Sequence, residues 1–174
     1  MQTNTDMKNN KSLKITAIIS GIFTAAICAV MNFRLIPIIE SEAGMRCFDM
    51  NFGYNYDEAI HFLSNITEYG RDVYLHMQLP LDFIYPIAYC AFFCSLIYLL
   101  TNRKSSLLAI PVFLAIFDYI ENILTVVMLK GSIPSVMVAN FASTATVFKT
   151  LIMYACFVII VILIIIRIVR RKKA

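Results

Sequence analysis

Three polar residues in the third long apolar stretch of this chain could do chemistry together. Asp118, Glu121 and Asn122 stand at positions i, i+3 and i+4, so an α-helix turns their side chains to one side. Ionisable groups inside a membrane-spanning segment are costly, need partners and mark functional sites by default. Paired carboxylates with different acidities serve general acid–base catalysis and also proton-coupled carriers. We therefore place the candidate site on this face.

The second apolar stretch contributes an acid between two prolines. Asp82 lies between Pro80 and Pro86, and Tyr85 and Tyr89 share its helical face. A proline inside a helix removes a backbone donor, so carbonyl groups near it need other partners. We expect the tyrosine hydroxyls to hydrogen-bond the Asp82 carboxylate.

Lys149 in the fourth stretch and Asn32 in the first complete the polar set. At a rise of about 1.5 Å per residue, these residues and the acids lie in the outer half of a hydrocarbon layer about 30 Å thick. Three carboxylates then face one cation. At least one of them is expected to be protonated, or a cation or amine-bearing ligand supplies the missing charge. The candidate catalytic residues are Asp118, Glu121 and Asp82, and the candidate ligand-binding residues are Asn122, Lys149, Tyr85, Tyr89 and Asn32.

The stretches that carry these residues read as membrane helices. The chain has 174 residues, of which 60% are hydrophobic and 15% charged, far more apolar than an ordinary soluble domain. A soluble bundle would show polar stripes, and residues 151–166 have almost none. The sequence predicts an all-α protein, a single four-helix transmembrane bundle with spans at about residues 15–33, 80–101, 106–128 and 141–166.

The net charge of +4 is a topology signal and does not indicate nucleic acid as a partner. Basic residues gather in tails 1–14 and 167–174 and in the loop at Arg103 and Lys104. The positive-inside rule places both termini in the cytoplasm, and in a bacterial host the membrane would be the plasma membrane. The lipid bilayer is thus the first expected partner.

Residues 34–79 form the one long connection, on the outer side. Asn55 with Glu58 three residues later is a capping-box pattern, and the apolar residues that follow have helical spacing. We expect a short amphipathic helix here that ends near Gly70. The acids of this connection would suit a protein partner with a basic surface.

No metal or cofactor is expected. His61 and His76 have no metal-ligand partner at i+3 or i+4. Cys47 is alone in the outer connection and the other four cysteines lie in apolar spans, so no disulfide framework is indicated. Glycine-rich phosphate loops, nucleophile elbows and haem motifs do not occur in the sequence.

The spacing of several motifs resembles that of small four-span membrane proteins of unassigned function. The pattern runs from Gly70-Arg71-x-x-Tyr74 through Leu81-Asp82-x-x-x-Pro86-x-x-Tyr89 and Asp118-x-x-Glu121-Asn122 to Lys149. In architecture the chain is also similar to the EXPERA group, which includes the sterol isomerase and sigma-2 receptor families. That resemblance implies intramembrane acids around a hydrophobic ligand pocket, and it assigns no residue roles.

Three functions follow from this set of residues. The first is a membrane enzyme or binding protein for a lipid-like hydrophobic or amine-bearing molecule, in which the carboxylates carry the acid–base chemistry. The second is a structural or accessory subunit whose polar cluster holds the helices together. The third is a small proton- or cation-coupled carrier, although carriers use internal repeats and none is evident here.

Overall fold

The structure, a computed structural model, describes residues 2–101, 106–131 and 134–172. Every regular element in these ranges is helical, which confirms the predicted all-α class. Arg103, Lys104 and Lys173, which carry part of the topology argument, lie outside the described residues. Within the described ranges, four helical stretches are long and apolar enough to cross a membrane, as expected: Lys11–Ala43, Glu68–Thr101, Ser106–Lys130 and Val136–Arg170.

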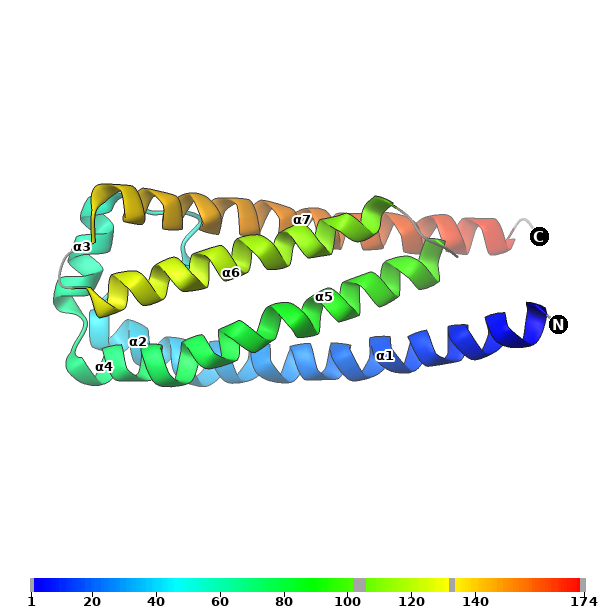
Figure 1. Ribbon diagram of the computed structural model, residues 1–174, viewed down its shortest axis with the longest axis horizontal. Coiled ribbons are helices and arrows are strands. Elements are labelled where there is room, and N and C mark those ends of the chain that lie inside the picture. Colours follow the sequence, from blue (N-terminus) through cyan, green and yellow to red (C-terminus); the bar gives the residue numbers. More distant parts are fainter. Residues whose placement is uncertain (1, 102–105, 132–133, 173–174) are drawn as a thin grey trace.

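The long helices lie beside one another in chain order. They are α1 (Gln2–Val30), α5 (Leu79–Thr101), α6 (Ala109–Lys130) and α7 (Val136–Lys172). α1 packs mainly on α5, α5 on α6, and α6 on α7. Both chain termini lie at one end of the molecule, and we call the opposite end the outer end (Figure 1).

The first two membrane helices continue well beyond their expected spans. α1 passes through a π-helical turn, η1 (Met31–Leu35), into α2 (Ile36–Ala43), and α4 (Glu68–Val73) passes through a second, η3 (Tyr74–Gln78), into α5. Pro37 and Pro80 each follow a π turn by two residues. A proline crowds the carbonyl four residues before it, and the wider π turn accommodates this misfit without ending the helix. The connection between the first two helices therefore covers residues 44–67 and not 34–79.

The first part of this connection turns back into the molecule. Gly44 ends α2 in the left-handed conformation, with φ 68°. Residues 44–55, which we call the re-entrant segment, then run back alongside α7 and contain a short 3₁₀ turn, η2 (Phe48–Met50) (Figure 1). The Tyr54 backbone N–H donates to the Ser143 hydroxyl of α7 at 2.8 Å. The buried Phe48 ring packs against the rings of Tyr54 and Phe62 and anchors the segment.

The helix expected after Asn55 is α3 (Tyr56–Asn65), and it begins with a complete capping box. The Asn55 side chain accepts from the Glu58 N–H at 2.9 Å, and the Glu58 carboxylate accepts from the Asn55 N–H at 2.8 Å. α3 ends before Gly70, contrary to the expectation, because Thr67 caps a new helix, α4. A Cβ at Gly70 would lie 2.5 Å from the Glu42 Cβ, so glycine here allows α4 to pack closely on α2.

Candidate functional site

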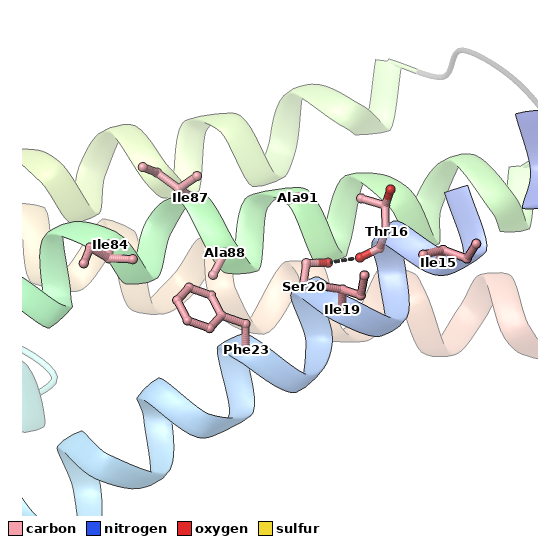
Figure 2. A pocket seen from close by; sticks show the side chains of 9 residues that line it. All are labelled: Ile15, Thr16, Ile19, Ser20, Phe23, Ile84, Ile87, Ala88 and Ala91. Atoms are coloured by element: carbon pink, nitrogen blue, oxygen red, sulfur yellow. Dashed lines mark hydrogen bonds between the residues drawn. The ribbon is translucent and has the colours of Figure 1, made fainter. Parts of the chain in front are cut away.

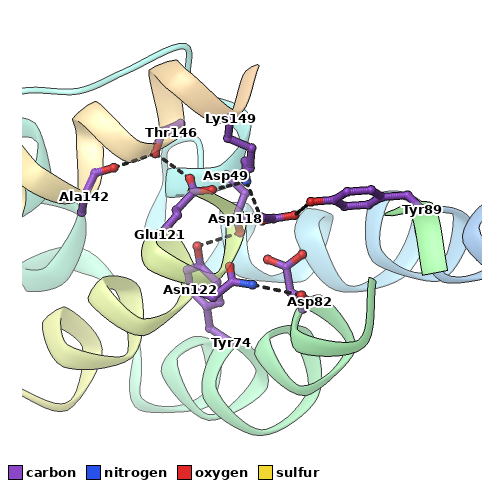
Figure 3. Close-up of polar contacts among 10 residues, drawn as sticks. All are labelled: Asp49, Tyr74, Asp82, Tyr89, Asp118, Glu121, Asn122, Ala142, Thr146 and Lys149. Carbon is purple, nitrogen blue, oxygen red and sulfur yellow. Dashed lines mark hydrogen bonds and ion pairs between the residues drawn. The ribbon is translucent and has the colours of Figure 1, made fainter. Parts of the chain in front are cut away.

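An ion-paired triad joins α6 and α7 in the outer half of the molecule. Lys149 of α7 forms ion pairs with Asp118, at 3.4 Å, and with Glu121, both on α6 (Figure 3). Asp118 is 2% exposed and Glu121 is fully buried. The i, i+3 spacing on α6 thus brings both carboxylates to one ammonium group, as the shared helical face predicts.

Hydrogen bonds from two further side chains complete this triad. The Tyr89 hydroxyl of α5 donates to Asp118 at 2.9 Å. The Thr146 hydroxyl of α7 lies 2.5 Å from a Glu121 carboxylate oxygen and 3.1 Å from the Ala142 carbonyl oxygen. Both acids of the triad therefore have a cation and a hydroxyl donor, the arrangement that a buried ion pair needs to be stable.

Asp82 and Asn122 meet across α5 and α6 through a backbone bond that a proline makes available. In a regular helix the N–H of residue 86 would bond the Asp82 carbonyl, but Pro86 has none. The Asn122 amide donates to that carbonyl at 2.9 Å instead. The Asp82 carboxylate is 3% exposed, and its Oδ2 has no hydrogen-bond partner among the described residues.

The re-entrant segment brings a fourth carboxylate, Asp49, to the cluster (Figure 3). The Tyr74 hydroxyl donates to Asp49 Oδ2 at 2.9 Å. Asp49 lies close enough to interact electrostatically with Asp82, Asp118, Glu121 and Lys149. Sequence reasoning missed this residue because it was one of several acids in a connection without periodicity.

Gln78 is a second residue that sequence reasoning missed. It is fully buried, and neither its amide nitrogen nor its oxygen has a hydrogen-bond partner in the described structure. It stands four residues after Tyr74 and four before Asp82, so it shares their side of the η3–α5 helix. That spacing was readable in the sequence and could have identified it.

Two groups of the re-entrant segment are held in their neutral forms. Burial, together with the carboxylates of Glu121 and Asp49, raises the pKa of the Tyr54 phenol above its ordinary value. Burial, together with Asp49 and Glu40, raises the pKa of the Cys47 thiol well above its ordinary value. Neither group therefore adds a negative charge to that of the Asp49 carboxylate. Cys47 is fully buried.

Among the remaining predicted site residues, Tyr89 belongs to this network, whereas Tyr85 and Asn32 lie apart from it. Tyr89 bonds Asp118 and not Asp82, contrary to the expectation. The half-buried Tyr85 packs edge-on against the Tyr89 ring at 5.1 Å and faces Cys28 of α1. Asn32 is exposed and donates to the carbonyl of Cys28 on its own helix at 2.9 Å.

The charges of the cluster do not balance. Asp49, Asp82, Asp118 and Glu121 gather around Lys149, which is the one cation that forms an ion pair with any of them in the described part of the chain. Arg71, a residue of the sequence pattern, is used elsewhere and donates to the carbonyls of Leu63 and Leu129. No group of three His, Cys, Asp or Glu side chains among the described residues has a geometry that could hold a metal ion.

An apolar groove lies apart from the cluster, between α1 and α5 (Figure 2). Ile19, Phe23, Ile87 and Ala88 are among its lining residues. Its Ser20 hydroxyl is already bonded to the Thr16 carbonyl at 2.6 Å. The groove can accept apolar chains, and none of the four carboxylates lines it.

No family model, curated protein or solved structure matches this chain. Its function is therefore argued from the geometry of the site.

Proposed function

We propose that this multi-pass membrane protein binds a small amine-bearing molecule with an apolar body at its carboxylate cluster, and that the cluster opens towards the outer end. The observation that carries this proposal is the excess of carboxylates over Lys149. A buried carboxylate without a counter-charge is costly, and an ammonium group offsets that cost directly. We place both termini in the cytoplasm because the basic residues gather in the two tails.

The different bonding of the acids supports different chemical roles for them. Asp118 and Glu121 form ion pairs with Lys149 and accept hydrogen bonds from hydroxyl groups. Their role would be to hold the Lys149 ammonium group in place and to set the charge of the site. Asp82 has a free carboxylate oxygen. If the bound molecule is converted by proton transfer, Asp82 is the acid that is available for it.

A structural role is the second candidate, and the completeness of the triad favours it. Lys149, Asp118 and Glu121 link α6 to α7, and Tyr89 links both to α5. This network would hold the helices together without any ligand. It does not account for the unpartnered groups of Asp82 and Gln78.

A carrier role is less well supported because the polar cluster does not continue across the molecule. Towards the termini it is followed by a buried apolar layer formed by Phe93, Ile97, Leu114, Cys156 and Ile160. A transported cation would need polar partners through this layer.

The proposal is tested by the melting temperature of the purified protein in detergent with hexylammonium or with hexanol at the same concentration. Hexylammonium should raise the melting temperature, since a ligand at about 100 times its Kd stabilises the folded state by about 2.7 kcal/mol. Hexanol has the same apolar chain without the charge and should leave the melting temperature unchanged. Asp72→Asn, which removes an exposed acid paired with His76, is the matched control and should keep the response. Equal responses to amine and alcohol would contradict the proposal.

A further inference from the structure

A set of buried polar atoms that have no hydrogen-bond partner among the described residues lies on the outer side of the triad. A polar atom buried without a hydrogen bond costs about 1–3 kcal/mol, so several in one place indicate groups that another molecule satisfies. We call these residues the outer subsite: Asp49, Gln78, Asp82, Asn122 and Thr125.

The outer subsite is assembled from three parts of the chain. Gln78 and Asp82 stand one turn apart on the η3–α5 helix. Asn122 and Thr125 stand three residues apart on α6, and Asn122 is tied to the Asp82 backbone at 2.9 Å. Asp49 comes from the re-entrant segment and accepts a hydrogen bond from the Tyr74 hydroxyl. Tyr74 stands one turn before Gln78 on the same helix. Gln78, Asn122 and Thr125 are fully buried.

The free atoms are mainly hydrogen-bond acceptors. Asn122 uses its amide nitrogen on the Asp82 carbonyl, so its Oδ1 is the atom that remains free. Asp82 Oδ2 and Asp49 Oδ1 are free carboxylate oxygens. These oxygens call for a donor that also carries positive charge, because Lys149 is already engaged by Asp118 and Glu121.

We propose that the outer subsite binds a primary ammonium group, whose N–H donors go to Asp49, Asp82 and Asn122. This inference rests on the proposed function and specifies the class of amine. A primary ammonium has three N–H donors, as the lysine side chain has. A quaternary ammonium has none and would leave the acceptor oxygens buried and unpaired. Gln78 and Thr125 provide an amide and a hydroxyl for a neighbouring polar group of the same ligand.

The test compares hexylammonium with hexyltrimethylammonium, which carry the same alkyl chain and charge, by titration calorimetry on the wild-type protein in detergent. We expect the primary amine to bind at least about tenfold more tightly, which corresponds to about one buried hydrogen bond. Equal binding of the two amines would overturn the subsite and leave the proposed function standing. Binding of neither would overturn both and would mean that water satisfies these atoms.

Variants locate the effect within the cluster. Asp82→Asn and Asp49→Asn should each weaken hexylammonium binding and reduce the preference over the quaternary amine. Asp72 is exposed and pairs with His76, outside the subsite, so Asp72→Asn should change neither the affinity for hexylammonium nor the preference over the quaternary amine. If a subsite variant does not fold, the wild-type preference for the primary amine still decides the question. An unchanged preference in folded Asp82→Asn and Asp49→Asn would overturn the assignment.

Discussion

Asp118 and Asp82 lie in the same polar cluster, yet their carboxylates are bonded in opposite ways. Asp118 has Lys149 at 3.4 Å and the Tyr89 hydroxyl at 2.9 Å. Asp82 has a carboxylate oxygen that is buried and unpartnered in the described structure. Removing an acid that has partners and removing an acid that has none should therefore have opposite effects on stability.

We expect Asp118→Asn to lower and Asp82→Asn to raise the stability of the ligand-free protein. The first change weakens a buried ion pair and a hydrogen bond, a loss of about 1–3 kcal/mol. The second removes a buried acid that has no counter-charge, and relieving such sites commonly gains about 0.5–2 kcal/mol. The measurement is the melting temperature in detergent, with Asp72→Asn as an exposed-acid control. A fall for both variants would mean that Asp82 belongs to the structural network and not to a ligand site.

At the scale of elements, the re-entrant segment is what distinguishes this molecule from a plain set of four helices. Its Asp49 reaches the carboxylate cluster, and its Cys47 is fully buried two residues away. The contact that holds Asp49 is the hydroxyl of Tyr74. A bond of this kind to a charged group contributes about 1.5–3 kcal/mol, so we expect Tyr74 to help hold the segment closed.

Maleimide labelling of Cys47 measures that opening. Tyr74→Phe should raise the labelling rate by about tenfold, since about 1.4 kcal/mol corresponds to a factor of ten. Burial, Asp49 and Glu40 raise the pKa of this thiol, and the thiolate is the reactive form, so the rate should increase with pH from about 7 to about 9. The background for the experiment replaces the other cysteines by alanine: Cys28, Cys90, Cys94 and Cys156.

Tyr69→Phe is the control for this experiment, because Tyr69 is exposed on α4 and its change should leave labelling as in the parent. Equal rates in Tyr74→Phe and Tyr69→Phe would mean that the Tyr74–Asp49 bond does not hold the segment closed. Hexylammonium should slow labelling in the parent protein if the ligand also holds Asp49.

At the scale of the whole molecule, the orientation in the membrane can be tested with two single-cysteine probes. Tyr69 is exposed on α4, which lies at the outer end, and Ser106 is exposed just before α6, whose first turns point towards the end that carries the termini (Figure 1). A membrane-impermeant thiol reagent should label Tyr69→Cys in intact cells and Ser106→Cys only after permeabilisation, because basic tails and loops stay in the cytoplasm. The reverse pattern would place the carboxylate cluster nearer the cytoplasmic side and would contradict an outward-facing site.

The local elements of the fold could be read from the sequence because their signals are local. The capping box at Asn55 and Glu58 needs residues only three positions apart, and it forms. The helical face of Asp118, Glu121 and Asn122 follows from the 3.6-residue period alone. Boundaries were harder to predict: hydropathy falls near residue 34, but the backbone hydrogen bonds continue through a π turn to Ala43.

The amino-acid sequence by itself determined four apolar helices and a buried excess of acid over Lys149, because composition and helical periodicity suffice for both. Only the tertiary structure decided which acids are paired. Tyr89 bonds Asp118 from 29 positions away, and Tyr74 bonds Asp49 from 25 positions away. Contacts at such separations depend on how helices pack and on where an aperiodic segment folds back, and neither leaves a local signal in the sequence. That packing also separates the satisfied triad from the unsatisfied outer subsite.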